Sequence, residues 1–451
     1  MISKPITDTG DGLVPAIQSS ASIRKVAIAS FIGTTIEWYD FFLYGTASAL
    51  IFNRLFFPNY DPLTGTLASF GTYAVGFAAR PIGGIVCGHF GDKIGRKSML
   101  ILTLLIMGIA TFLIGCLPTY NQIGIWAPIL LVVLRIAQGF GVGGEWGGAV
   151  LMAVEHSPKG RRGFYGSWPQ IGVPAGLLVS TVIFAQISKM PEEALFAWGW
   201  RIAFLLSIVL VGVGVFIRLA VTEPPLFAEI KRAGAEARTP VLDALREHPK
   251  SVLLAMGARI AENGAFYIYT VFSLTYATQP RIGFSRSWVL AAISIAAIIE
   301  LVSMPTFGAL SDRVGRRPVY LFGAIFTGIF AFPFFWLIET SRTQFMVLAI
   351  VIALVLGHSA MYGPQASFFS ELFGTRVRYS GASLGYQLAS VVAGGLSPLI
   401  ATALLKRYGA SWPVALLIIA FAAITAVSVF LATETAHAEI GSAVKAHSTA
   451  E

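Results

Sequence analysis

The chain has 451 residues, of which 55% are hydrophobic and only 12% are charged, and its formal net charge is +9. Soluble domains carry about 25% charged residues, whereas the mean hydropathy here is +0.73. This composition excludes a disordered chain, a disulfide-rich secreted scaffold and an ordinary soluble enzyme. The two cysteines, Cys87 and Cys116, form no CxxC pair, so neither a metal site nor a disulfide framework is expected. The sequence predicts an all-α, multi-pass membrane protein.

Long apolar segments follow one another along the chain. A membrane-spanning helix needs about 20 mainly apolar residues. By this criterion, twelve transmembrane helices are expected at about 25–52, 66–90, 98–117, 126–154, 164–188, 200–221, 251–278, 288–310, 318–339, 344–369, 378–404 and 412–433. Residues 1–22 are polar and lack the short apolar core of a cleavable signal peptide.

The basic residues are distributed unevenly between the two sides of these helices. If the N-terminus is cytoplasmic, 21 Lys and Arg lie on the cytoplasmic side and 8 on the other, while Arg80, Arg135 and Arg259 lie within helices. This asymmetry follows the positive-inside rule. We therefore expect a plasma membrane protein, in a bacterial inner membrane, with both termini cytoplasmic. The net charge then reflects topology in the lipid bilayer, and nucleic acid is not an expected partner.

Four sequence landmarks recur in order in the two halves of the chain. The segment Glu37–Tyr44 matches Glu262–Tyr269 after 225 positions, and Gly91–Lys97 matches Ser311–Arg317 after 220. Glu155 and Trp200 have later counterparts in Glu371 and Trp412. Two parallel six-helix bundles with a binding site between them are typical of transporters. The expected organisation is a tail at 1–22, bundles at 23–222 and 250–434, a linker at 223–249 and a tail at 435–451.

The repeated loops at 91–97 and 311–317, together with Arg135–Gly139, resemble motifs of the major facilitator superfamily. Within it, the chain most resembles the metabolite:proton symporter family, which includes shikimate, ketoglutarate, citrate and proline/betaine permeases. The segments that carry this resemblance are 37–41, 77–83, 88–92, 139–148 and 198–201. The resemblance implies a major facilitator fold and transport coupled to protons. No nucleotide-binding domain is visible, so we expect a proton gradient and no cofactor, and we expect a monomer.

Two acidic residues on the first predicted span are candidates for proton coupling. Glu37 and Asp40 lie three residues apart and therefore share a helical face. Arg135 lies at a compatible depth on the fourth span, and a charge at mid-membrane needs a partner or a watery cavity. We expect Arg135 to pair with Asp40 until substrate or a proton competes, with Glu37 assisting. The alternative is a static ion pair that only fixes helix packing.

Two buried arginines are candidates for holding a substrate anion. Arg80 has no acidic neighbour on its own helix and could bind a carboxylate through two parallel hydrogen bonds. Its alternative partners are Glu37 and Glu145. Arg259 and Glu262 lie three residues apart on the seventh span, so they either satisfy each other or face the cavity. Among family members, the combination with His358 most resembles the shikimate permeases.

Further polar residues within the spans suit recognition of hydroxyl or carboxylate groups. His358 is either a ligand and proton relay or a satisfied packing residue, and Glu300 receives no role. Each neutral candidate could equally bridge helices. These candidates are Gln138, Gln170, Tyr362, Gln365, Tyr386 and Gln387.

The duplicated loops are expected to form a gate on the cytoplasmic side. An aspartate would lie near a helix N-terminus across the bundle interface, and the basic residues would contact an acidic helix end. In the first half the gate residues are Asp92, Arg96, Lys97 and Glu155, and in the second half Asp312, Arg316, Arg317 and Glu371. Such contacts would close one side and break when it opens. The glycine-rich run 139–148 lacks a phosphate-loop pattern and predicts close helix packing.

These features predict a secondary active transporter that imports a small polar organic acid, such as shikimate, with protons by alternating access. The first alternative is a proline/betaine-type symporter, although residues 435–451 are too short for a coiled-coil extension. A proton-driven exporter, a membrane enzyme and a receptor are further alternatives. No nucleophile–base pair or metal-ligand set converges at one depth, which argues against an enzyme.

Overall fold

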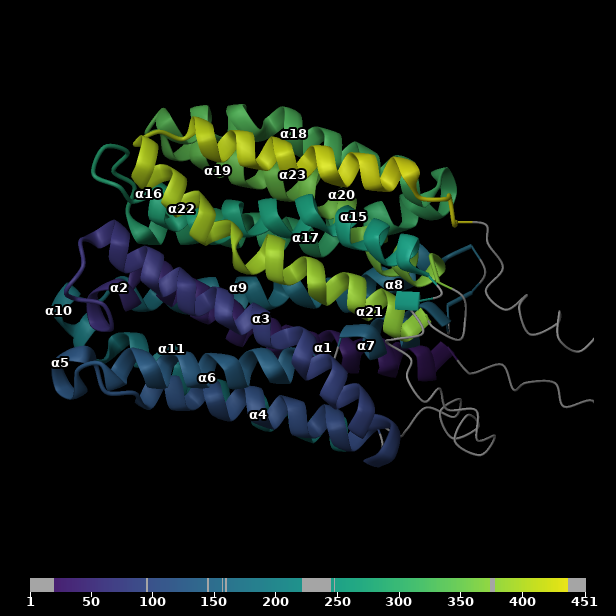
Figure 1. The fold of residues 1–451 in the computed structure, drawn as a ribbon, viewed down its shortest axis with the longest axis horizontal. Helices are drawn as coiled ribbons and strands as arrows, with labels where there is room; N and C mark the ends of the chain where they lie inside the picture. Colours follow the sequence, from purple (N-terminus) through teal and green to yellow (C-terminus); the bar gives the residue numbers. More distant parts are fainter. Residues whose placement is uncertain are drawn as a thin grey trace, which may run out of the picture.

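The computed structural model describes residues 20–94, 96–143, 146–155, 157–158, 160–220, 245–246, 248–373 and 378–436. Its helices run roughly side by side along one direction, with the N-terminal and C-terminal halves stacked on each other (Figure 1). Seven continuous helical stretches among the described residues are long and apolar enough to cross a membrane by length and composition. Together with the other long helices they form the twelve expected rods.

The first half contributes six of these rods. They are α1 (Ser20–Leu50), α3 (Pro62–Ile94), α4 (Arg96–Cys116), α6 with α7 (Trp126–Val142, Trp146–Glu155), α8 with α9 (Arg162–Gln170, Gly172–Ile187), and η1 with α11 and α12 (Leu195–Gly199, Trp200–Leu205, Ser207–Ala220). The short helices α2 (Phe52–Leu55), α5 (Tyr120–Ile123) and α10 (Glu192–Ala194) lie at the turns. Packing of α1 on α9 and of α6 between α3 and α4 holds this bundle together.

The second half repeats this arrangement, and three of its rods contain a π-helical segment, as the last rod of the first half does at η1. The rods are α15–η2–α16 (Pro249–Tyr267, Ile268–Phe272, Ser273–Ala277), α17 (Arg286–Val314), α18 (Arg316–Glu339), α19–η3–α20 (Thr343–Ile352, Ala353–His358, Ser359–Glu371), α21–η4–α22 (Arg378–Ala389, Ser390–Gly395, Ser397–Tyr408) and α23 (Trp412–Leu431). Single π-helical turns occur frequently at functional sites. Nothing in the hydrophobic pattern predicted these segments.

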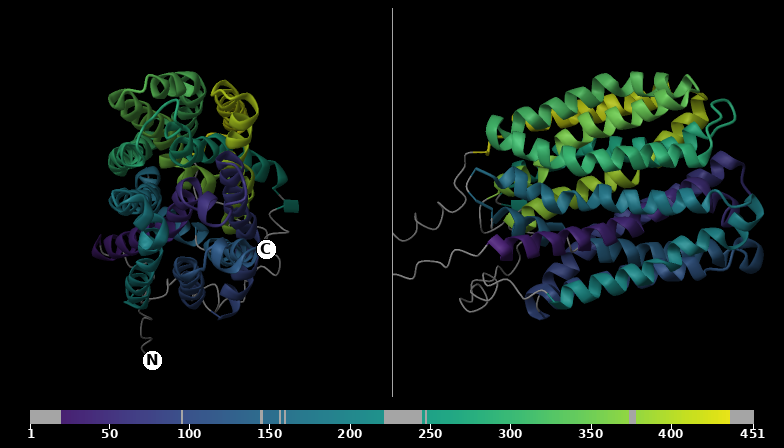
Figure 2. Two further views of the ribbon diagram at one scale, coloured as in Figure 1. Left: turned by 90° about the vertical axis from the view of Figure 1, so that its left-hand side faces the viewer. Right: turned by 180° about the vertical axis from the view of Figure 1, so that it is seen from behind.

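The two bundles touch at both of their ends. We call the end where α1 begins and α23 ends the terminal end, and the other the opposite end (Figures 1 and 2). Helix α17 packs along α8 and α9, while α3 packs against η4 and α22. At the opposite end, Lys406 Nζ lies 3.4 Å from Asp61 Oδ2. Contacts between the bundles are therefore present at both ends.

Glycines allow helices α3 and α6 to approach closely. A Cβ atom added at Gly83 would overlap the backbone of Phe140, and one at Gly139 would overlap the backbone of Gly76. Helices of membrane proteins associate closely where small residues face each other. Gly139 therefore packs as the sequence predicted for its glycine-rich run.

Candidate functional site

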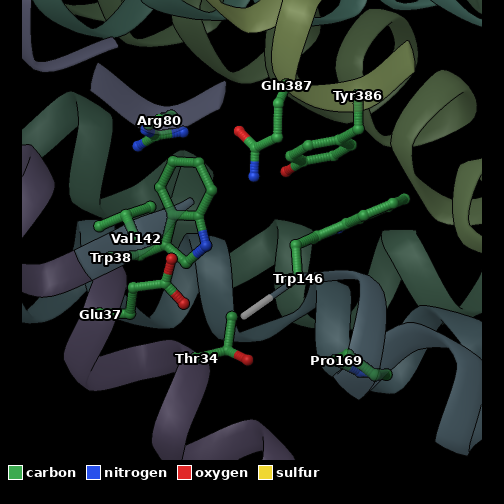
Figure 3. Close-up of a pocket in the computed structure, with 9 residues that line it drawn as sticks. All are labelled: Thr34, Glu37, Trp38, Arg80, Val142, Trp146, Pro169, Tyr386 and Gln387. Carbon is green, nitrogen blue, oxygen red and sulfur yellow. The ribbon is translucent and has the colours of Figure 1, made fainter. Parts of the chain in front are cut away.

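A small cavity lies between the bundles and is lined by residues of both. A second, smaller space lies toward the C-terminal bundle, and Trp38 lines both spaces. Figure 3 shows the residues that line the first cavity, which are Thr34, Glu37, Trp38, Arg80, Val142, Trp146, Pro169, Tyr386 and Gln387. The second space is lined by Trp38, Val173, Arg259, Glu262, Asn263, Phe266, Tyr267, His358 and Tyr362. Both bundles thus contribute polar groups, as a site with alternating access requires.

Arg80 is the cation at the first cavity, where helix α3 holds it. Its side chain is only 1% exposed, yet Nε and Nη2 have no hydrogen-bond partner. The guanidinium instead packs on aromatic rings, with Cζ 4.0 Å from the ring centre of Phe41 and 4.5 Å from that of Phe77. Among the described residues no acidic group forms an ion pair with it. A buried cation with unused donors is chemically able to bind an anion.

The expected ion pair between Asp40 and Arg135 is wrong for this conformation. Arg135 donates from Nη1 to Gln138 Oε1 at 3.0 Å and stacks on Phe41, Tyr44 and Tyr73. Both carboxylate oxygens of Asp40 are buried, and neither has a hydrogen-bond partner among the residues that the structure describes. The rings that surround the Arg135 guanidinium hold it away from the carboxylate.

The remaining candidates in the first half divide between the cavity and the bundle interior. Glu37 lines the cavity. Gln138 donates to the Thr111 hydroxyl at 2.6 Å and does not line either space. Gln170 accepts from Trp146 Nε1 at 3.1 Å and donates across the interface to the Tyr362 carbonyl oxygen at 3.4 Å. Gln138 and Gln170 therefore serve as bridges in this conformation, the less specific of their two expected roles.

In the second half, Arg259 and Glu262 satisfy each other. Arg259 Nη1 donates to Glu262 Oε2 at 2.8 Å and to Gln365 Oε1 at 2.7 Å. Gln365 in turn donates to Glu262 Oε2 at 3.0 Å. Gln365 is not one of the residues that line the second space. The Arg259 guanidinium also packs 3.2 Å from the ring centre of Tyr386. Arg259, Glu262, His358 and Tyr362 nevertheless line the second space.

Glu300 on α17 belongs to this network, although the sequence gave it no role. Its Oε1 lies 2.6 Å from His358 Nδ1, while His358 Nε2 lies 3.2 Å from Glu262 Oε1. A glutamate within an apolar span was the available signal, since a charge at that depth needs a partner. Its partner is 58 residues away, so no local spacing rule could identify it.

Aromatic side chains form part of the cavity walls, and among them the sequence named only Tyr362 and Tyr386 as candidates. The rings of Trp146 and Tyr386 stack across the bundle interface with centres 3.7 Å apart. Figure 3 shows this pair beside Gln387, with Arg80 and Trp38 across the cavity. Gln387 Nε2 donates to the Gly143 carbonyl oxygen at 3.1 Å. The walls thus combine flat apolar faces with a few polar groups.

The second-half loop residues lie at the terminal end. Asp312 accepts hydrogen bonds from the backbone N–H groups of Gly163 and Phe164, at 2.7 and 2.9 Å, where α8 begins in the other bundle. Arg316 binds Asp312 at 2.8 Å and Glu371 at 3.1 Å. Residues 312, 316 and 371 therefore adopt the contacts expected of a gate.

Arg317 was expected in the gate, but it contacts the end of α23 instead. Its guanidinium donates to the carbonyl oxygens of Val429 and Phe430. Carbonyls in the last turn of a helix lack intrahelical partners and attract cations. The side chains of Asp92, Arg96, Lys97 and Glu155 lie outside the described residues.

Comparison with known proteins identifies the family. Residues 30–393 match the family description Major Facilitator Superfamily. The chain belongs to this superfamily. It is 44% identical over 424 residues to the shikimate transporter of Escherichia coli strain K12, covering 93% of this chain and 97% of that one. It is 35% identical over 400 residues to the proline/betaine transporter of the same strain, covering 86% and 79%.

The fold agrees with this assignment. A crystal structure of the proton:xylose symporter XylE superposes with a TM-score of 0.70 over 93% of this chain and 98% of that one, at 17% identity. This major facilitator protein is a secondary transporter rather than an enzyme. It crosses the membrane several times and moves a small molecule.

Proposed function

We propose that this protein imports a small hydroxylated organic acid, of the shikimate type, together with protons. The observation that carries the proposal is Arg80, a buried guanidinium at a cavity between the bundles, whose Nε and Nη2 have no hydrogen-bond partner among the described residues. Its free donors suit a carboxylate, and relationship to a shikimate transporter supports that class of substrate.

The other cavity groups favour one carboxylate over several. Arg259 is already neutralised by Glu262 at 2.8 Å, so Arg80 supplies the available positive charge among the described cavity residues. Gln387 and the Tyr386 hydroxyl offer neutral partners for substrate hydroxyl groups, while Trp38 and Trp146 offer flat surfaces for a ring. A tricarboxylate would leave further charges unpaired at a high cost.

We propose Asp40 as the proton carrier of the first bundle, with Glu37 assisting at the cavity. Asp40 is 1% exposed, and neither carboxylate oxygen receives a hydrogen bond from the described part of the chain. A charged group buried in this way is costly, so the neutral, protonated carboxyl suits this closed state. Arg135 would stabilise the ionised form in a state where the rings around it move apart.

We place the terminal end in the cytoplasm, on the strength of the basic residues gathered there. Contacts of Asp312 with Gly163 and Phe164 would then close the cytoplasmic side while the cavity is loaded from outside. The proposal therefore assigns both termini to the cytoplasm of a bacterial inner membrane.

Uptake of labelled shikimate into cells at acidic external pH, with and without a protonophore, tests this function. Accumulation that the protonophore abolishes is the expected result. Replacing Arg80 with Gln removes a charge-assisted contact that contributes about 1.5–3 kcal/mol, so the apparent KM should rise by about tenfold to a hundredfold. Arg80→Lys keeps the charge and should retain part of the affinity. Arg54→Gln, exposed at the opposite end, is the matched control. Wild-type kinetics in Arg80→Gln would refute the role of Arg80.

A zwitterionic osmolyte is the second candidate, because Trp38, Trp146 and Tyr386 line the cavity. Aromatic faces attract quaternary ammonium groups, and one relative is a proline/betaine transporter. Unlabelled glycine betaine that competes with shikimate at equal concentration would favour this candidate. Shikimate efflux driven by an inward proton gradient would instead indicate an exporter.

A further inference from the structure

A cluster of charged side chains lies within the C-terminal bundle, apart from Asp40. His358 ends the π-helical segment η3, and each of its ring nitrogens faces a carboxylate oxygen. Nδ1 lies 2.6 Å from Glu300 Oε1, and Nε2 lies 3.2 Å from Glu262 Oε1. The exposed fractions of Glu300, Glu262 and His358 are at most 3%.

This geometry requires one proton more than a neutral histidine and two carboxylates possess. A neutral imidazole has one N–H donor and one acceptor nitrogen. One of the two contacts would therefore set a nitrogen lone pair against an oxygen lone pair. An additional proton removes this clash, whether it resides on the His358 ring or on a carboxyl group of Glu300 or Glu262.

The charges of the cluster lead to the same count. Arg259 balances Glu262, which it contacts at 2.8 Å. With a neutral His358, the carboxylate of Glu300 leaves one uncompensated negative charge inside the bundle. Uncompensated buried charge is strongly unfavourable. One bound proton makes the whole cluster neutral.

Two observations distinguish a proton site from a static ion pair. Glu300 Oε2 is buried and has no hydrogen-bond partner within the described ranges, whereas a purely structural pair would be expected to satisfy both oxygens. Glu262 and His358 also line the second space between the bundles, which gives a proton a path from the cavity.

We propose that Glu300 and His358 form a proton-binding site of the C-terminal bundle, which takes up a proton through Glu262 and His358 and releases it during transport. This inference rests on the proposed symport and adds a proton position to that of Asp40. Helix α19 contains no titratable residue. The titratable and charged groups around the pair on the other neighbouring helices are Arg259 and Glu262 on α15, Tyr320 on α18, Tyr362 on α20 and Tyr386 on α21.

The first test detects the proton without any substrate. The chain has six histidines, so ¹⁵N-histidine labelling of the purified full-length protein in lipid yields few signals, and His358→Gln identifies the one from His358. We expect this signal to change with pH. The midpoint of its pH titration should differ between wild type and Glu300→Gln by about one pH unit or more, because loss of a close charged partner produces a shift of that size. Ser359→Ala removes a neutral hydrogen bond to the same carboxylate at 3.3 Å and should leave the midpoint unchanged.

The second test measures coupling in proteoliposomes with labelled shikimate. Losing one coupled proton lowers the maximum accumulation ratio about tenfold for each unit of the pH gradient. Glu300→Gln should show this loss and keep exchange of labelled for unlabelled shikimate, which shows that the variant is folded. A His358 signal with the same pH dependence in wild type and Glu300→Gln would overturn the proposal. If wild-type protein does not transport shikimate, the proposed substrate fails, while the histidine signal still decides this inference.

Discussion

Neutralising Asp312 should open the terminal end of the transporter. Both Asp312 oxygens accept backbone N–H groups of the other bundle, from Gly163 at 2.7 Å and Phe164 at 2.9 Å. In Asp312→Asn, the amide oxygen still accepts one of these bonds, but the NH₂ group faces the other donor. A hydrogen bond to a charged group contributes about 1.5–3 kcal/mol. Loss of about 2 kcal/mol would favour the open state by about thirtyfold.

Alkylation of a cysteine introduced at Ala366 measures this opening. Ala366 is fully buried on α20, facing Gly166 of the other bundle, so it becomes reactive only when the bundles separate there. The assay requires a background in which Cys87 and Cys116 are replaced by Ser. In detergent, a polar maleimide should label the cysteine at position 366 faster in Asp312→Asn than in the same protein with Asp312 intact, by up to about thirtyfold. Asp61→Asn, at the opposite end, is the control and should not accelerate labelling. An unchanged rate in Asp312→Asn would refute the assignment of these contacts as a latch.

Three further changes test other parts of the structure. Gly83→Ala adds a Cβ that overlaps the backbone of Phe140, so it should destabilise the protein by about 1–3 kcal/mol in thermal unfolding. The control Gly71→Ala lies on the same helix, and its Cβ meets no described atom within 4 Å, so it should leave the stability unchanged. Phe41→Leu removes the ring on which two guanidiniums stack at 4.0 and 4.1 Å, and it should raise the apparent KM for shikimate more than Phe41→Tyr does. Hydrogen bonds from Thr64 lower the pKa of Asp61 to about 2. Asp61 therefore stays ionised from pH 8 down to pH 5. Its contact with Lys406 weakens only as the pH falls toward the pKa of Asp61. Asp61→Asn should therefore retain the wild-type dependence of uptake on pH between pH 5 and 8. A changed dependence would contradict the lowered pKa of Asp61.

The succession of spans could be predicted because the thickness of the membrane fixes the length of each apolar segment. Helix α3 covers Pro62–Ile94 where 66–90 was expected, since its terminal turns continue beyond the apolar core. The π-helical segments η2, η3 and η4 were not predicted. They depend on hydrogen-bond shifts within a packed bundle and leave no mark on hydrophobic periodicity.

Some pairings of the candidate residues were predicted, such as Arg259 with Glu262, whereas the pairing of Asp40 with Arg135 is absent among the described contacts. An isolated charge at mid-membrane depth correctly drew attention to Arg80, which lies at the cavity. The same reasoning paired Asp40 with Arg135, because it used depth along the membrane alone. Partner choice also depends on the rotation of each helix and on the rings of Phe41, Tyr44 and Tyr73, which hold Arg135.

By itself, the sequence determined the number of spans, the division into two related bundles and the charged residues that need partners in the membrane. These features follow from hydrophobic length, from internal repetition and from the cost of burying charge, all of which are properties of the chain in its solvent. Only the tertiary structure decided that Glu300 meets His358 and that Arg80 has no acidic partner among the described residues. The contact of Glu300 with His358 joins two helices across 58 residues of sequence, and its geometry is set by how the helices pack.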